Sequence, residues 1–220
     1  MVQGTESKHR EKLTRDRVIE AALQIMDEEG LEAVTMRNVA RALGVEAMSL
    51  YHHVEDKDDL LDGICEHVMT GFEFPEPSDD WAENVRRGAR AWRNLLRRHP
   101  SVMRLFAERH GAVRSAGSLL PMEFALRLLR SGGLSTRDAV LAFQAFGGYI
   151  EGTVMMDANK MPGHHHQTAL DDAFSHADAA ETLPTLAEAF PYFQDCDSDE
   201  QFEFGLDLLI DGLRAHAARI

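Results

Sequence analysis

The side chains with the clearest chemical use gather between Thr35 and Lys57, in the stretch TMRNVARALGVEAMSLYHHVEDK. Hydroxyl, imidazole and ammonium groups are frequent there, and such donors bind the phosphate oxygens of nucleic acids. The apolar spacing fits two short helices joined by a turn at Gly44, and the second helix buries little beyond Leu50 and Val54. A short helix that buries so little predicts an outward-facing surface suited to the major groove of DNA.

Other groupings that resemble chemical sites are weaker. Three consecutive histidines, His164–His166, follow a Met-Pro-Gly turn and cannot all face one metal ion from a helix, so we expect a solvated loop, with a metal site as the alternative. The acidic residues from Asp195 to Glu200 lack the glycine and the spacing of a calcium loop and are expected to favour a helix start. No GxSxG, HExxH, P-loop or GxGxxG pattern occurs. We predict no catalytic residue, no metal site and no cofactor.

The elements that must position these residues are all expected to be helices, because apolar residues recur at helical spacing and no segment alternates as a strand does. The expected helices cover residues 14–29, two segments within 35–54, 56–71, 79–99, a segment from Pro100, 118–130, 136–159 and 199–218. Residues 161–191 read as irregular, with one or two short helices. The predicted fold class is all-α: an N-terminal three-helix helix-turn-helix domain with a linking fourth helix, residues 1–72, and a C-terminal helical ligand-binding and dimerisation domain, residues 78–220.

Charge restricts the kind of nucleic-acid binding to expect. The chain carries a formal charge of −14, and its first 60 residues hold eight basic against thirteen acidic side chains. Positive charge is nevertheless concentrated before and at the start of the first helix, at Lys8, Arg10, Lys12, Arg15 and Arg17, and Arg37, Arg41 and Lys57 add to it near the helix pair. Because phosphate contacts are electrostatic while the overall charge repels DNA, we expect salt-sensitive, specific binding with little general affinity.

The two cysteines, Cys65 and Cys196, are too few for a disulfide scaffold, and Cys65 falls on an apolar helix face as a core residue would. No apolar run approaches the roughly 20 residues that span a membrane. The N-terminus lacks the apolar centre of a secretory signal. The expected location is the cytoplasm.

Two long helices carry more apolar surface than one core needs. The segment 136–159 has a wide apolar stripe flanked by Ala145, Gly148 and Gly152, which permit close helix approach, and the last helix adds Phe204 and Leu208 beside its main stripe. Such width indicates a homodimer interface, with a wholly buried helix in a monomer as the alternative. A two-fold pair of helix-turn-helix units would match successive major grooves about 34 Å apart.

These residues resemble the TetR family of bacterial transcriptional regulators. The similarity runs from Val18 to Leu61 through EEGLEAVTMRNVARALGV and SLYHHVEDKDDLL. The C-terminal part resembles the tetracycline-repressor branch, through Trp81, FGGYIEGTV around Gly148 and the closing FEFGLDLLIDGL. The resemblance implies a repressor that a small molecule releases from double-stranded operator DNA.

The resemblance also implies DNA contacts at matching positions. Phosphate contacts fall on Thr35, Arg37, Tyr51, His53 and Lys57, and base-edge contacts on Ala47, Met48 and Ser49. The apolar Ala47 and Met48 can meet a thymine methyl group but offer no hydrogen bond to guanine. Glu46 stands where a small hydroxyl cap is common, and it can cap poorly, repel phosphate or accept a hydrogen bond from cytosine. The operator sequence therefore stays open.

In the sensor half, Phe106 and Met156 align near the magnesium-ligand positions of tetracycline repressors, and neither side chain ligates magnesium. Tetracycline is therefore not the expected effector. The side chains expected around the effector are His67, Trp92, Met103, Phe106, Phe143, Phe146 and Met155. They favour a small apolar or aromatic molecule, although each also fits the role of a core residue.

The resulting hypothesis is a homodimeric, ligand-responsive DNA-binding regulator that is no enzyme. Effector binding would move the fourth helix through His67 and change the separation of the recognition helices. The rival hypothesis is a helical ligand-binding or enzyme-like protein of the same fold that no longer binds DNA. The acidic N-terminal domain and the apolar Ala47 and Met48 favour the rival.

Overall fold

The computed structural model describes residues 12–108, 115–159, 182–194 and 197–219, and every regular element within these ranges is helical. The expected all-α class is confirmed. The chain divides into two compact units, one formed by residues up to Gly71 together with Ser101–Leu119, the other by Phe72–Pro100 together with residues from Leu120 on.

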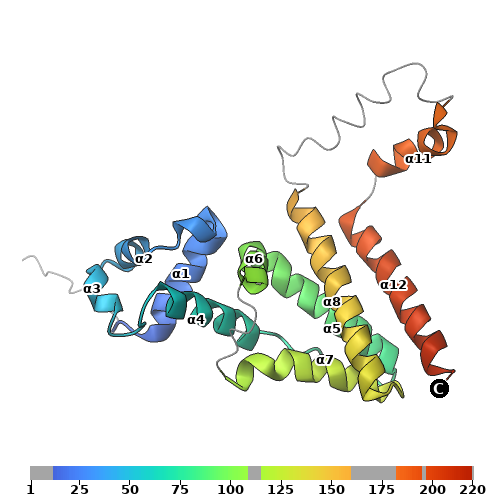
Figure 1. Ribbon diagram of the computed structural model, residues 1–220, viewed down its shortest axis with the longest axis horizontal. Helices are drawn as coiled ribbons and strands as arrows, with labels where there is room; N and C mark the ends of the chain where they lie inside the picture. The colour runs from blue at the N-terminus through green and yellow to red at the C-terminus, as the bar shows by residue number, and fades with distance from the viewer. Residues whose placement is uncertain (1–11, 109–114, 160–181, 195–196, 220) are drawn as a thin grey trace, which may run out of the picture. The chain divides into compact units, whose positions relative to one another are not determined.

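The first unit contains the predicted helix-turn-helix. Its elements are α1 (Arg15–Glu29), η1 (Leu31–Ala33), α2 (Met36–Leu43), α3 (Ala47–Leu50), α4 (Lys57–Thr70), all but the first residue of α6 (Pro100–Glu108) and η2 (Gly117–Leu119). Figure 1 shows α1 to α4 as one cluster, with α3 at the end of the turn that follows α2. Helix α1 packs on both α2 and α4.

Side-chain caps explain where these helices begin. The hydroxyl of Thr14 accepts from the Arg17 backbone N–H at 3.3 Å and starts α1, and that of Thr35 accepts from Asn38 at 3.2 Å and starts α2. Helix α2 ends at Gly44, whose φ of 65° lies in the left-handed region that glycine tolerates best. These local signals fix the turn between α2 and α3.

The core of the first unit is formed by the inward faces of α1, α2 and α4. Its fully buried side chains are Val18, Ala22, Met26, Val34, Val39, Leu50, Leu60 and Ile64. Close approach of α1 to α4 depends on Gly63, because a Cβ atom there would lie 2.7 Å from Cδ1 of Ile19. Apolar packing therefore stabilises the inward side of the helix-turn-helix, and the outward side takes no part in this core.

Residues 101–119 differ from the predicted domain organisation, which assigned them to the C-terminal domain. The structure groups them with the first unit. η2 packs against α4, Gly117 lies beside Thr70, and Arg104 Nη2 lies 3.6 Å from Glu32 Oε1. This return of the chain depends on contacts between distant residues, which local periodicity does not encode.

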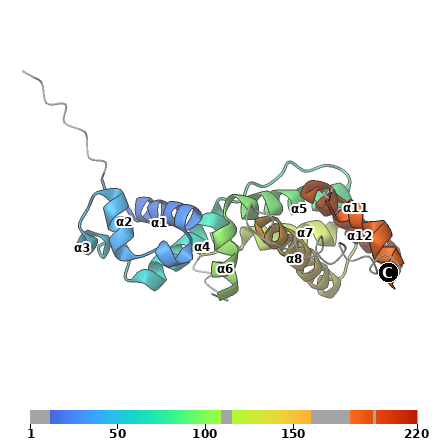
Figure 2. The same ribbon diagram turned by 90° about the horizontal axis from the view of Figure 1, so that it is seen from above.

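The second unit is built on long helices. Its elements are α5 (Trp81–Arg98), α7 (Leu120–Ser131), α8 (Thr136–Asn159), α11 (Pro184–Gln194) and α12 (Ser198–Ala217). Figure 2 shows α5 and α7 alongside one another with α8 crossing them, in agreement with their packing. Trp81 lies against the backbone at the end of α7, where a Cβ on Gly132 would come within 2.6 Å of its ring.

Helices α5 and α12 are joined by a ladder of arginine–carboxylate pairs, which we call the α5–α12 ladder. Its pairs are Arg86–Asp207, Arg90–Glu203 at 2.7 Å, Arg93–Asp199 at 2.7 Å, Arg97–Asp199 at 2.7 Å and Arg214–Asp80 at 2.8 Å. Residue numbers rise on one helix as they fall on the other, so the helices are antiparallel. The ladder fixes which face of α12 turns away from α5.

Arg93 is the buried member of this ladder, with only 4% of its surface exposed. Its guanidinium also pairs with Asp157 of α8 at 3.0 Å, donates to the Ser198 carbonyl and lies 4.3 Å from the ring centroid of Phe202. One side chain therefore ties together α5, α8 and α12.

The acidic run before the last helix has a clear outcome. Asp197 caps α12 through the backbone N–H groups of Asp199 and Glu200, as the acidic run predicts, while Asp195 and His164–His166 lie outside the described residues. Within the described ranges, no helix has the length and apolar character needed to cross a membrane, and no group of three or more ligand-type side chains is arranged for a metal ion.

Candidate nucleic-acid interface and sensor unit

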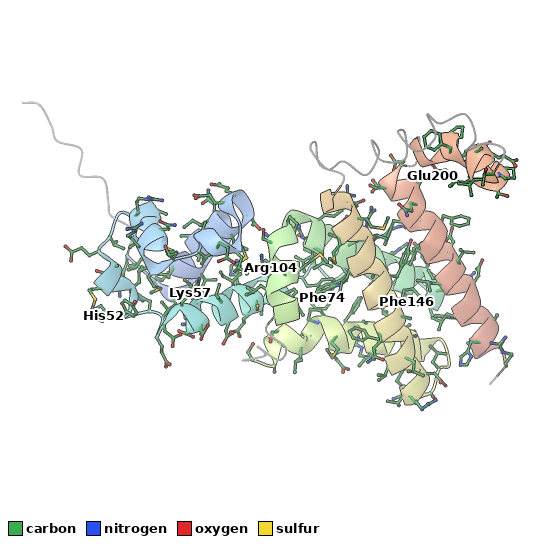
Figure 3. The ribbon with its side chains drawn as sticks, turned by 45° about the horizontal axis from the view of Figure 1, so that its top comes forward. His52, Lys57, Phe74, Arg104, Phe146 and Glu200 are labelled. Carbon is green, nitrogen blue, oxygen red and sulfur yellow. The ribbon has the colours of Figure 1, made fainter. Side chains whose placement is uncertain are left out.

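The outward face of α3 and the turn after it is formed by Met48, Tyr51 and His52, which follow the i, i+3, i+4 spacing of one helix face. All three are exposed, Met48 by 71%, while Leu50 and Val54 are buried on the opposite side. Figure 3 places His52 beside α3 and Lys57 at the start of α4. The face combines a hydroxyl, an imidazole and a thioether.

Basic groups are exposed on the helices before and after this face. Arg37 and Arg41 on α2 and Lys57 on α4 are exposed, and among the residues that the structure describes they form no ion pair. Thr35 caps α2, yet its hydroxyl hydrogen remains free to donate. Exposed cations of this kind are suited to phosphate contacts.

The remaining predicted DNA contacts are half-buried. Ala47 begins α3, Ser49 and His53 lie at its inner edge, and the His53 N–H donates to the Leu50 carbonyl at 2.8 Å. These positions lie on the same short segment as the exposed face. That each of these side chains contacts DNA remains a prediction.

An ion pair between the half-buried Arg15 and the buried Asp59 holds this segment in place. Arg15 Nη1 donates to Asp59 Oδ2 at 2.7 Å and Nη2 to Oδ1 at 2.8 Å, and Nη1 also donates to the His53 carbonyl at 2.9 Å. Asp59 is 4% exposed and also accepts from the Glu55 N–H. The start of α1 is thereby locked to the segment between α3 and α4.

This arrangement corrects one sequence-based interpretation. Arg15 counted there among the positive charges available near DNA. The hydrogen bonds that Arg15 donates to Asp59 raise the pKa of the Arg15 guanidinium, which therefore stays charged, and the charge is offset by Asp59 within the unit. Sequence signals missed the pair because 44 residues separate its members.

The residues expected around an effector fall in both units. His67 in the last turn of α4 and Met103 and Phe106 on α6 are half-buried in the first unit. In the second unit, Phe146 is 8% exposed and Trp92 and Phe143 are half-buried.

Met155 has a different environment from the one predicted, because it is 59% exposed on α8 and lies beside the exposed Met156. Within the single chain it faces outward. The period of α8 turns it toward the same side as Leu141 and Gly148.

Aromatic side chains gather within the second unit. Phe72 lies 4.9 Å from Phe74, 6.2 Å from Trp92 and 6.2 Å from Phe124, measured between ring centroids. Of these, sequence reasoning singled out Trp92 alone. Helical periodicity gave no signal for Phe72 and Phe74, since both lie in the extended segment between α4 and α5.

A cavity of about 440 Å³ lies beside this cluster. Its lining comes from α7, α5 and the segment before α5, with the apolar residues Phe74, Pro75, Pro77, Leu120, Phe124 and Leu128 and the polar residues Glu76, Asn84, Glu123 and Arg127. Its volume falls in the range of small-molecule sites. None of the residues predicted for the effector lines it.

Helices α8 and α12 lie side by side in opposite directions (Figure 1). The Tyr149 hydroxyl lies 2.9 Å from the Phe202 carbonyl, and the two rings stack 5.8 Å apart. The outward sides of the two helices form what we call the α8–α12 face. Its exposed apolar residues are Leu141, Met155, Met156, Phe204 and Leu208, and it includes Gly148 and Gly152, beside which a Cβ would meet no atom within 4 Å.

Comparison with known families agrees with this geometry. Residues 18–64 match the bacterial regulatory proteins of the tetR family, and residues 74–217 match the tetracyclin repressor-like C-terminal domain. The chain belongs to the TetR family. It is accordingly a DNA-binding transcriptional regulator, and the helix-turn-helix of the first unit is its DNA-binding region.

Individual family members are similar over nearly the whole chain. HTH-type transcriptional repressor DrrR1 of Streptomyces coeruleorubidus is 32% identical over 216 residues, covering 94% of this chain and 79% of the relative. Tetracycline repressor protein class D of Escherichia coli is 31% identical over 205 residues, covering 91% and 89%. These relatives are regulators and not enzymes.

Among solved structures, apo ActR of Streptomyces coelicolor has a TM-score of 0.80 at 32% identity, covering 94% of this chain and 97% of ActR. ActR in complex with actinorhodin has a TM-score of 0.77 at 33% identity, covering 94% and 99%. The two-unit helical fold is thus shared with a TetR-family protein that binds a small molecule.

Proposed function

We propose that the protein is a homodimeric repressor that a small apolar or aromatic effector releases from its operator. The observation that carries the proposal is the exposed α3 face, with Tyr51 and His52 outward and Arg37 and Lys57 beside it. A hydroxyl, an imidazole and two cations are the donors that phosphate oxygens accept along a groove. DrrR1 and the class D protein are both named repressors, which supports repression over activation.

The α8–α12 face supports the homodimer. Phe204 is 68% exposed and Leu208 is 60% exposed, which is unfavourable for side chains of this size in water. Gly148 and Gly152 leave room for a second helix to approach closely. A two-fold copy of the same face would bury these residues and present two α3 helices to one operator.

Apolar and aromatic surface in the second unit supports the effector class. Trp92 joins the aromatic cluster of Phe72, Phe74 and Phe124, and Phe146 is buried on α8. A planar apolar molecule stacks well on such rings. ActR, which binds actinorhodin, supports the same class by similarity.

The connection between the two functions runs through α4. Its last turn contains His67 and is followed directly by Phe72 of the aromatic cluster. We infer that an effector that reorders the cluster shifts the end of α4 and with it the α3 helices. If the effector binds the shifted conformation more tightly than the DNA-competent conformation, DNA binding weakens by that difference in effector affinity.

We further propose that the protein acts in the bacterial cytoplasm, where its operator lies, and carries no catalytic activity. Its relatives are regulators. The rival proposal, a helical ligand-binding or enzyme-like protein without DNA affinity, draws on the net charge of −14 and the apolar Met48. One experiment separates the two.

The experiment is a gel-shift titration with DNA flanking the protein's own gene. We expect a specific complex that weakens steeply as salt rises from 50 to 200 mM, since phosphate contacts release counterions. Tyr51→Phe removes one hydroxyl donor per recognition helix and is expected to weaken binding about tenfold or more. Tyr192→Phe changes a more exposed tyrosine, on α11, and should leave binding unchanged. Absence of any specific complex would favour the rival.

The effector class is tested by release of the bound DNA. Actinorhodin is a suitable first probe, with tetracycline and Mg²⁺ as the contrast. We expect tetracycline to leave the complex intact, because Phe106 and Met156 supply no magnesium ligand. The two tryptophans, Trp81 and Trp92, report binding by fluorescence. We expect the effector to quench tryptophan fluorescence in Trp81→Phe but not in Trp92→Phe. Quenching that survives in Trp92→Phe would show that the effector does not bind beside Trp92.

A further inference from the structure

The side chain of α3 that is most exposed, and so faces outward, is apolar. Met48 is 71% exposed, whereas its helix neighbour Leu50 is fully buried. Ala47 precedes it and carries no polar group. Glu46 is exposed and makes no capping hydrogen bond to α3. The beginning of α3 therefore presents a thioether, a methyl group and a carboxylate, and no side-chain hydrogen-bond donor.

The major groove offers few partners for such a surface. Guanine presents two acceptors, O6 and N7, which require a donor. A carboxylate repels these acceptors, and a thioether laid over them removes their water without a replacement bond. The one apolar group that a base pair presents in the major groove is the C5 methyl of thymine. Contact between this methyl and Met48 removes two apolar surfaces from water.

We propose that Met48 reads a thymine C5 methyl group in each half-site of the operator. The inference rests on the proposed DNA-binding function and names the chemistry of one base position. Ala47, the preceding residue, is half-buried and leaves Met48 as the exposed side chain at the start of α3. The flexible Met side chain adapts to the methyl without requiring hydrogen-bond geometry.

Deoxyuridine tests this contact because it differs from thymidine only by the missing methyl group. Every thymidine of the operator is replaced in turn, symmetrically in both half-sites, and the dissociation constant is measured by gel shift at fixed salt. Loss of one buried methyl is expected to weaken binding about fourfold per half-site, and so about 15-fold for the symmetric pair. One position, or two adjacent ones, should show this loss.

Variants assign the loss to Met48. In Met48→Ala the uracil and thymine operators should bind within twofold of one another at that position, because the methyl has lost its partner. Met48→Leu keeps an apolar side chain of similar volume and should retain most of the discrimination. Met122→Ala shortens an exposed methionine on α7 and should preserve all of it.

The outcomes distinguish this inference from the function on which it rests. A specific complex that is equally tight on all uracil operators would overturn the Met48 reading and leave the regulator proposal intact. Uracil sensitivity that persists undiminished in Met48→Ala would assign the methyl to another side chain. Failure to bind any flanking DNA would remove both proposals together.

Discussion

Arg15 and Asp59 illustrate how one pair of residues sets the geometry of the DNA-binding surface. Their two parallel hydrogen bonds are of the bidentate type that fixes orientation as well as distance. Because Arg15 also holds the His53 carbonyl, the backbone just after α3 cannot tilt independently of α1. We infer that the pair acts by positioning the side chains proposed to contact phosphate.

Asp59→Asn should lower the free energy of unfolding by about 2 kcal/mol, the typical contribution of hydrogen bonds to a charged group. Urea unfolding followed by circular dichroism measures the loss. Glu83→Gln is the comparison, since Glu83 pairs only within its own helix, with Arg86 at i+3 and Arg87 at i+4, and such pairs are expected to contribute about 0.5 kcal/mol each or less. Equal losses in the two variants would show that burial of Asp59 adds nothing.

At the scale of elements, the α5–α12 ladder orients an apolar helix face. Its arginines lie on one side of α5, at Arg86, Arg90, Arg93 and Arg97, and their partners fall on one side of α12. The opposite side of α12 then carries Phe204 and Leu208 outward. Ion pairs at this location contribute direction more than net stability, since most are partly exposed.

Gly148→Val should dissociate the proposed dimer while leaving each chain folded, because its Cβ meets nothing within 4 Å in the single chain. Sedimentation velocity measures the change from dimer to monomer. Gly147→Val is the control: it makes the same substitution one residue earlier on α8, rotated about 100° from the face, and has the same helix propensity cost. Dimers of equal stability in both variants would argue against the α8–α12 face as the interface.

Asp199 gives the ladder a pH dependence. Its hydrogen bond to Arg93 is the main cause of a pKa below the ordinary value of 3.8. A lowered folded-state pKa contributes stability that is present above the unfolded-state value and is lost as pH falls through the folded one. The thermal midpoint of Asp199→Asn should therefore lie below wild type by a constant interval from pH 8 to pH 5, and the interval should close below pH 4.

Asp79→Asn provides the comparison, because Asp79 is exposed and just precedes the cap of α5. It should unfold like wild type throughout this range. An Asp199→Asn interval that persists undiminished at pH 3 would show that the carboxylate charge is not what stabilises the ladder.

At the scale of the whole molecule, the proposed function requires two chains. A single α3 is four residues long and offers too few contacts for a specific operator, so affinity depends on both half-sites being engaged at once. A two-fold dimer matches half-sites one turn of DNA apart, about 34 Å, or a multiple of it. The acidic charge of −14 then helps specificity, because it weakens binding that lacks the paired contacts.

Insertion of five base pairs at the operator centre should weaken binding roughly 100-fold or more, because it turns one half-site to the far side of the helix and removes the second binding event. Footprinting and gel shift measure this effect. A ten-base-pair insertion is the control for loss of flanking sequence. It returns both half-sites to the same side of the DNA while it lengthens the distance between them. Equal affinity for the original and the five-base-pair operators would indicate independent half-site binding.

The sequence by itself determined the local structure and the family. Caps such as Thr35 and Asp56, the turn at Gly44 and the apolar stripes act over three to four residues, so periodicity reads them directly. The helices fall within a few residues of their predicted bounds for that reason. The α3 segment with Met48 and Tyr51 was recognisable because its side chains have few apolar neighbours along the chain.

The tertiary structure alone decided which charged and apolar groups meet. Arg15 pairs with Asp59 across 44 residues and Arg214 with Asp80 across 134, and Ser101–Leu119 returns to the first unit. The outward position of Met155 likewise follows from the rotation of α8 set by its neighbours. Local propensity acts over a helical turn, whereas a charge or an exposed face acquires its role from whichever distant element folding brings beside it.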